Sequence, residues 1–139
     1  LPALLQETGK FILADLIASE KKSELFKSKI ASGASVENVE KELLGVTTSQ
    51  ITAQIFRHWK LSDNLINMIE HVDDISNASD NFKKKSQILD VLKTACNIKE
   101  PLSDENIEKA TQKVLAYGFD VKIFKKAIET LQDRLLEEE

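Results

Sequence analysis

The chain has 139 residues and a formal net charge of −4 at pH 7, a length typical of a single domain. With only four glycines and two prolines, it lacks the turn residues that a β-barrel or β-sandwich requires, so long helices are favoured. The acidic balance argues against binding to duplex nucleic acid. The single cysteine excludes an intrachain disulfide and a zinc site built mainly from cysteine.

Apolar residues recur at helical spacing along the whole chain, and no convincing strand or repeat interrupts them. In chain order, this spacing predicts helices over about 2–19, 20–31, 36–44, 48–59, 64–72, 82–98, 105–117 and 121–135. The polar run 73–81 is the clearest loop, because its Asp, Asn and Ser side chains bond to their own backbone. The sequence therefore predicts one compact all-α domain of about eight helices over residues 1–139.

Several helix ends carry specific signals. Thr47 and Gln50 have the spacing of a capping box, in which each side chain bonds the other residue's backbone N–H. Ser35 and Asp120 stand where N-cap residues are expected. Gly45 follows a predicted helix at the position that favours a left-handed residue. The longest apolar stretch, residues 11–18, is too short to cross a bilayer, so we expect no membrane partner.

Residues with chemical potential are few. The chain has two histidines, His58 and His71, so a three-histidine metal centre is impossible. The one histidine–carboxylate cluster is His71, Asp73 and Asp74. We interpret it as the end of a helix, where a cation meets the negative end of the helix dipole, and keep a metal site as the alternative.

Three further features have a structural and a functional interpretation. Trp59 shares an apolar stripe with its neighbours and is predicted to be a core residue rather than a ligand platform. Cys96 falls on an inward helix face and is predicted to be buried rather than nucleophilic. The basic triplet 83–85 is predicted to be a solvated helix face, with an anion site as the alternative.

Two segments carry a recognisable pattern when they are taken together. Residues 4–10, Leu-Leu-Gln-Glu-Thr-Gly-Lys, resemble the Leu-Leu-His-Asp-Ile-Gly-Lys stretch of the HD superfamily of metal-dependent phosphohydrolases. Residues 42–69 resemble the pattern of the HDOD domain (HD-related output domain) of bacterial signalling proteins, with Gly45, Trp59 and Leu61 in register without a gap. The resemblance covers about residues 3–75 and continues more weakly to 98, and it implies an HD-like helical fold.

The same resemblance shows where the family's metal ligands are replaced. Gln6 and Glu7 stand at the His-Asp pair, and Thr48 stands at the histidine that follows Leu-Gly. The paired histidines of a later helix fall one place after His71, so Asp73 occupies the second position. A neutral amide is a poor substitute for imidazole, and the remaining carboxylates do not make a metal cage. We therefore expect no catalytic residue, no metal and no cofactor.

The resemblance implies a non-catalytic regulatory module of bacterial signal transduction. We expect such a module to be cytoplasmic, to act through contacts with a protein partner not named by the sequence, and to bind no nucleic acid. One alternative is a degenerate phosphohydrolase that binds metal weakly through Glu7, His71, Asp73 and Asp74. Another is a nucleotide or second-messenger binding module that uses Arg57 and the lysines Lys83, Lys84 and Lys85.

The family's domain has a helical half before the His-Asp-like segment, and this chain starts close to that segment. We expect the chain to be the C-terminal portion of a longer protein. The apolar face of the first helix would then be exposed or covered by a second copy, which makes a homo-oligomer possible.

Overall fold

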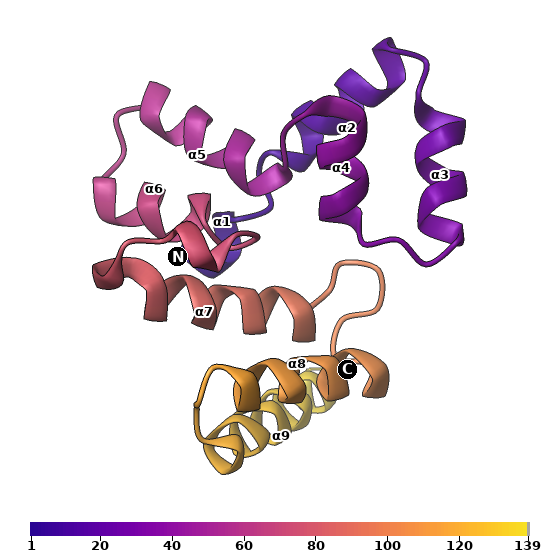
Figure 1. Cartoon of the computed structure of the whole chain (residues 1–139). Helices are drawn as coiled ribbons and strands as arrows, with labels where there is room; N and C mark the ends of the chain where they lie inside the picture. Colours follow the sequence, from indigo (N-terminus) through magenta and orange to yellow (C-terminus); the bar gives the residue numbers. More distant parts are fainter. Residues whose placement is uncertain (139) are drawn as a thin grey trace. The chain divides into compact units, whose positions relative to one another are not determined.

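The computed structural model describes residues 1–138, and within them it contains helices and no strand. The all-α fold class with about eight helices is confirmed. In chain order, the elements are α1 (Pro2–Leu5), α2 (Lys10–Ser19), α3 (Ser23–Ala31), α4 (Val36–Leu44), α5 (Thr48–His58), α6 (Asp63–Glu70), the 3₁₀ helix η1 (Ile75–Asn77), α7 (Asp80–Ala95), α8 (Asp104–Ala116) and α9 (Val121–Glu137) (Figure 1). None of the helices in this described part is long and apolar enough to span a membrane.

The chain divides into two compact units, Leu1–Ser86 and Gln87–Glu139, and α7 contributes to both. The single domain expected over residues 1–139, the last of which lies outside the described residues, stays a prediction.

The first unit is built around α5 and α6, which pack side by side (Figure 1). Phe56 on α5 and Ile69 on α6 are almost completely buried, as are Leu13 on α2 and Val39 on α4. In the first half of α7, the Ser86 hydroxyl donates to the backbone carbonyl of Met68 on α6 at 2.9 Å.

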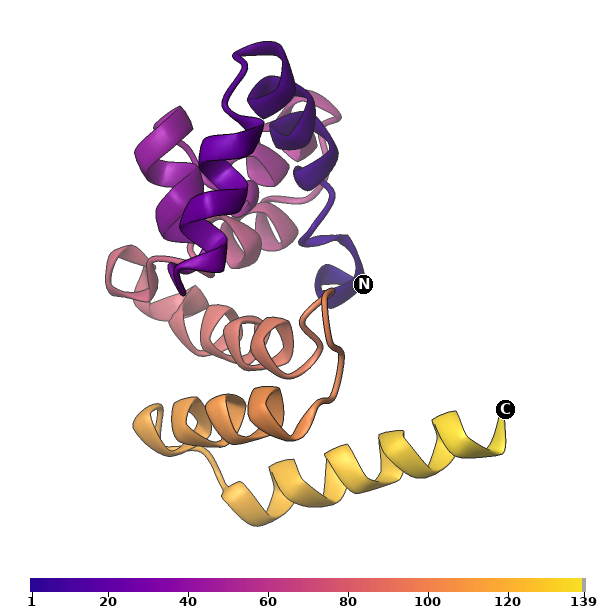
Figure 2. The ribbon, with the colours of Figure 1, turned by 90° about the vertical axis from the view of Figure 1, so that its right-hand side faces the viewer.

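In the second unit, the last part of α7 packs with α8 and α9. Its core consists of five buried side chains, which are Val91, Ala95, Ala110, Val114 and Ile128. Figure 2 shows α9 running beneath α8 and then continuing past it toward the C-terminus.

The helix-end signals of the sequence are confirmed where the structure describes them. Thr47 and Gln50 form the reciprocal capping box, and the Ser35 hydroxyl accepts from the third backbone N–H of α4. Asp120 caps α9 in the same way, and Gly45 adopts the left-handed conformation with φ 76°. Local side-chain and backbone chemistry therefore sets these boundaries.

The prediction of one continuous helix over 2–19 is wrong, because the structure has two helices there. The structure ends α1 at Leu5 and starts α2 at Lys10, because the intervening residues bond α5 instead of continuing the helix. Two other starts move by two or three residues, since α3 begins at Ser23 rather than at 20, and α7 begins at Asp80 rather than at 82. The 3₁₀ turn η1 lies inside the predicted loop 73–81.

The core predictions for Trp59 and Cys96 are also wrong. Trp59 is 60% exposed and stacks on Phe56 with ring centroids 6.1 Å apart. It follows the last residue of α5, where the chain turns through Lys60 with φ 56°, so the apolar stripe ends before it. Cys96 is exposed because α7 ends at Ala95, which takes the buried place.

Candidate functional site

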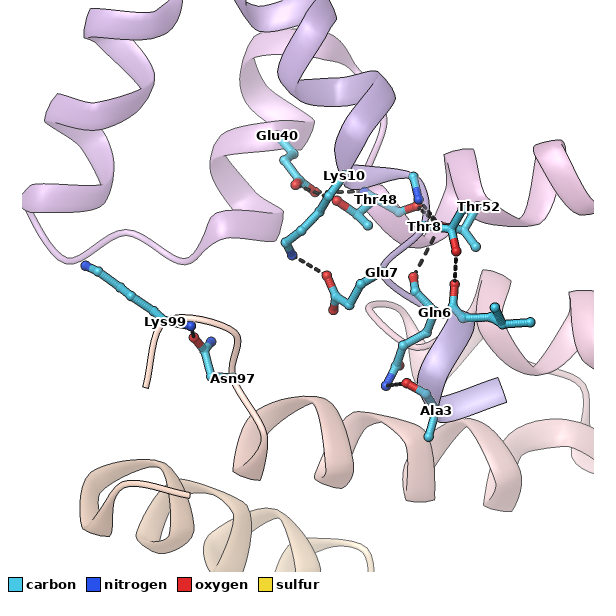
Figure 3. Close-up of polar contacts among 12 residues, drawn as sticks. Ala3, Gln6, Glu7, Thr8, Lys10, Glu40, Thr48, Thr52, Asn97 and Lys99 are labelled. Atoms are coloured by element: carbon cyan, nitrogen blue, oxygen red, sulfur yellow. Dashed lines mark hydrogen bonds and ion pairs between the residues drawn. The ribbon is translucent and has the colours of Figure 1, made fainter. Parts of the chain in front are cut away.

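The segment between α1 and α2 lies against the first turns of α5. The hydroxyl of Thr52, which is fully buried, accepts a hydrogen bond from the backbone N–H of Gly9 at 2.8 Å. The same hydroxyl lies 2.8 Å from the carbonyl oxygen of Thr48 and 3.2 Å from that of Gln6. One α5 side chain thus holds the backbone of the segment that resembles the His-Asp motif (Figure 3).

Gly9 allows this close approach because it has no Cβ. A Cβ at this position would lie 2.6 Å from the backbone oxygen of Thr48 and 2.8 Å from the Thr52 hydroxyl. Such distances are inside van der Waals contact, and a backbone atom cannot rotate away. The glycine is therefore required by packing, since its φ of −65° is available to any residue.

Gln6 is buried at the place of the family's histidine. Its side chain is 4% exposed, and its amide nitrogen donates to the carbonyl of Ala3 at 3.4 Å. Its Oε1 is buried and has no hydrogen-bond partner within the described part of the chain. In Figure 3 the side chain folds back on α1, so it serves the local backbone.

Glu7 forms an ion pair with Lys10, one turn further along the segment. Both side chains are a little under one-third exposed. The Lys10 ammonium therefore already balances the charge of the Glu7 carboxylate. This is the ordinary arrangement of an ion pair between residues i and i+3.

Thr48 is tied to a carboxylate that the sequence analysis did not single out. Its hydroxyl donates to Oε1 of Glu40 at 2.6 Å, and its backbone N–H donates to Oε2 of the same residue at 2.8 Å. Both residues are almost fully buried. A carboxylate at the first turn of α5 is stabilised by the free N–H groups and the helix dipole. One signal could have identified Glu40: it lies four residues after Val36 and three before Leu43, on the inward face of α4.

His71 and Asp74 lie in the turn that ends α6. His71 is the C-cap residue of that helix, as the helix-end interpretation predicts. The Asp74 carboxylate accepts from the Asn77 amide at 2.6 Å and from the Ser76 hydroxyl at 2.8 Å, and these bonds hold the pKa of Asp74 below its usual value. Asp74 is exposed and Asp73 is half-buried. This arrangement is that of an Asx-stabilised turn.

Glu7, His71, Asp73 and Asp74 are not gathered around one point. Within residues 1–138, no three His, Cys, Asp or Glu side chains lie where they could hold one metal ion. The donor set at the motif positions is thus an amide, a carboxylate paired with lysine and a hydroxyl paired with a carboxylate, which does not fit a divalent metal centre.

The basic residues of the anion-binding alternative lie on different elements. Arg57 on α5 is ion-paired with Glu70 on α6, and this hydrogen-bonded pair raises the pKa of Arg57. The triplet 83–85 is on the first turns of α7, where the Lys85 ammonium lies 5.8 Å from the centroid of the Phe82 ring. Arg57 is already neutralised by its partner, so it is a weak contributor to an anion site.

Comparison with protein families identifies one match: the family model of the HDOD domain matches residues 1–75, more than half of the chain. No curated protein sequence matches the chain.

Two solved structures share its fold. A virulence factor from Campylobacter jejuni subsp. jejuni is 21% identical with a TM-score of 0.63, and the match covers 87% of this chain and 47% of that one. A protein from Shewanella amazonensis SB2B that carries the provisional name of a phosphohydrolase is 20% identical with a TM-score of 0.66, over 91% of this chain and 47% of that one. The chain spans about half the length of each of these proteins.

Proposed function

The chain belongs to the HDOD domain family, and from this premise we propose that it is a non-catalytic regulatory module of bacterial signal transduction. In this proposal it resides in the cytoplasm and acts through contacts with a protein partner. The family resemblance supplies the signalling context, and the donor set at the motif positions supports the absence of catalysis.

One observation carries the proposal: Thr48 and Glu40 are bonded to each other in the core. The hydroxyl and the N–H of Thr48 both donate to that one carboxylate. To bind a metal, the Thr48 side chain would have to direct a lone pair toward the ion, and this would compete with its hydrogen bonds to Glu40. Because both residues are buried, separating them would leave unpaired polar groups away from water. The position therefore stabilises the join between α4 and α5.

Gln6 supports the same conclusion. Its neutral amide is a weak donor for the metals that imidazole binds, and its amide nitrogen is used by the carbonyl of Ala3. Without a metal there is no Lewis acid and no activated water at this position. The helices persist because their core residues are independent of these ligands.

A role through protein contacts needs apolar side chains on the surface. In the first unit Leu4 and Phe11, on α1 and α2, are 80% and 83% exposed. Both side chains lie on the N-terminal apolar face, and its exposure to solvent or cover by a second copy stays a prediction. Exposed apolar groups of this size are typical of protein interaction surfaces.

The test separates this proposal from the degenerate phosphohydrolase. The purified chain is dialysed against Mn²⁺, Fe²⁺ or Zn²⁺, analysed for bound metal, and assayed with a generic phosphodiester. We expect no stoichiometric metal and no turnover above that of the buffer.

The matched control compares the two histidines of the chain. One bound metal per chain, with turnover lost in His71→Ala and kept in His58→Ala, would overturn the proposal in favour of the enzyme. Calorimetric titration with cyclic dinucleotides tests the other alternative, a nucleotide or second-messenger binding module. A saturable binding signal that is lost in the triple variant Lys83→Ala, Lys84→Ala, Lys85→Ala would replace the proposal by a ligand-binding function.

A further inference from the structure

Helix α2 has apolar side chains on all sides, but the first unit covers only one stripe of them. Leu13 and Ile17 are buried, where α2 packs with α3 and α5. A helix that is apolar all round is normally covered on every side. We call the uncovered side the α2 face. It consists of Asp15 and five exposed apolar residues, which are Phe11, Ile12, Ala14, Leu16 and Ala18.

The α2 face exposes large apolar side chains as well as small ones. Phe11 is 83% exposed, and Ile12 and Leu16 are 44% and 37% exposed. Neighbouring apolar groups on a surface are typical of a docking site, and aromatic residues such as phenylalanine are enriched in protein interfaces. The exposed side of α2 is therefore better suited to contact another molecule than to face water.

Asp15 lies at the middle of the α2 face. Its neighbours one helical turn away on the same face are Phe11 and Ala18. The Asp15 side chain is exposed, and no hydrogen bond or ion pair holds it within the part of the chain that the structure describes. Lys10, the only basic residue of α2, is already paired with Glu7. The α2 face thus presents one uncompensated carboxylate among apolar groups.

This carboxylate discriminates among the molecules that could cover an apolar face. Insertion into a lipid surface would carry Asp15 toward the hydrocarbon, at a large cost in free energy. A second copy that docks its own α2 face, centred on Asp15, would bring two carboxylates together, and like charges repel. A partner with a basic side chain compensates Asp15 and covers the apolar groups at the same time.

We infer that the α2 face binds a helix of a partner protein, with an Arg or Lys of that helix paired to Asp15. Apolar residues of the partner helix cover Phe11 and Ile12 on either side of this pair. A helix is the fitting shape because residues at spacings of three and four form the ridges and grooves into which a second helix packs. The inference rests on the regulatory function proposed above, since it gives the chemistry of that protein partner.

Selection from a peptide library tests the charge. The probe is a phage-displayed library of helical peptides that have a leucine face and random residues at its centre. We expect selection on the purified chain to enrich Arg or Lys at the random positions. Selection on Asp15→Lys is expected to enrich Asp or Glu instead, because the charge to be compensated is reversed. The matched control is Asp133→Lys, which makes the same change at an exposed carboxylate of α9 and should select the same peptides as the unmodified chain.

The tightest peptide from this selection then tests the apolar part of the α2 face. Its affinity for the full chain is measured by fluorescence anisotropy. Phe11→Ser is expected to weaken binding about tenfold or more, because it removes an aromatic anchor from the contact. Leu115→Ser, at a 62% exposed leucine of α8, is expected to leave binding unchanged. Circular dichroism checks that each variant keeps its helices.

Three outcomes would overturn the inference: no peptide binds up to millimolar concentration, the selected peptides show no preference for a basic residue, or binding survives both Asp15→Lys and Phe11→Ser. Self-association of the chain that is lost in Phe11→Ser would assign the face to a second copy and would equally overturn it. The metal and phosphodiester assays do not involve the α2 face. Failure of peptide binding therefore leaves the non-catalytic proposal standing, whereas metal-dependent turnover overturns that proposal whatever binds to α2.

Discussion

The hydroxyl of Tyr117, the C-cap residue of α8, donates a hydrogen bond of 2.5 Å to the Asp90 carboxylate on α7. The other oxygen of this carboxylate lies 2.7 Å from the Lys113 ammonium. Asp90 is 7% exposed, so a buried charge is satisfied by two donors, Lys113 and Tyr117, one turn apart at the C-terminal end of α8. This cluster joins two helices of the second unit beside its apolar core.

Tyr117→Phe is expected to destabilise the chain by about 1–3 kcal/mol, because it removes a donor from a buried carboxylate and leaves the ring in place. Asp90→Asn is expected to cost a comparable amount, since it removes the charge that Lys113 pairs with. Urea unfolding followed by circular dichroism measures both changes. No change in the unfolding free energy of Tyr117→Phe would show that water replaces the hydroxyl without cost.

Stability is expected to fall above about pH 10, the ordinary pKa of tyrosine. Burial and the neighbouring Asp90 carboxylate raise the pKa of Tyr117 above that value. The unfolded chain then releases the phenolic proton before the folded chain does, so the Tyr117 contribution is complete below about pH 10 and is lost as the pH rises toward the raised pKa. Tyr117 is the only tyrosine, so its absorbance change follows its titration directly. The Tyr117→Phe variant should lose less stability over the same alkaline range, and an equal loss would contradict the assignment.

Gly9→Ala is expected to destabilise the first unit by about 1–3 kcal/mol, because the new methyl group meets the Thr48 carbonyl. Helix propensity alone predicts the opposite sign, since alanine is favoured over glycine. Thermal unfolding measures the change. Gly33→Ala is the comparison: nothing lies within 4 Å of its added Cβ, and only its φ of 92° opposes the substitution. A stabilised Gly9→Ala variant would mean that the segment moves away from α5.

Thr48→Val is expected to cost about 1–3 kcal/mol, because the buried Glu40 carboxylate loses its hydroxyl donor. Thr48→Ser keeps the hydroxyl and should stay much closer to the original stability. The two variants are compared by chemical unfolding. Equal losses in both would assign the effect to packing of the methyl group rather than to the hydrogen bond.

Trp59→Ala is expected to change the unfolding free energy by less than about 1 kcal/mol, whereas Phe56→Ala should cost about 3–5 kcal/mol. The difference follows from exposure, which is 60% for Trp59 and 1% for Phe56. Because Trp59 is the only tryptophan, its fluorescence should show a solvent-exposed emission maximum and strong quenching by acrylamide. A blue-shifted, protected emission would place the ring in an interface or a core.

The helices and most of their ends were predictable from the amino-acid sequence, because the signals that define them are local. The capping box of Thr47 and Gln50, the caps Ser35 and Asp120, and the left-handed Gly45 depend on residues within one turn of each other. The replacement of the family's ligands at Gln6 and Thr48 could also be predicted from the order of residues along the chain.

The tertiary structure alone decided the roles that these residues now have. The break between α1 and α2 exists because Thr52, 43 residues further on, accepts the N–H of Gly9, and Thr48 is satisfied by Glu40 across a helix junction. The exposure of Trp59 likewise follows from where α5 ends against its neighbours. Contacts between distant residues depend on how helices pack, and the spacing of residues along one helix carries no information about its partner.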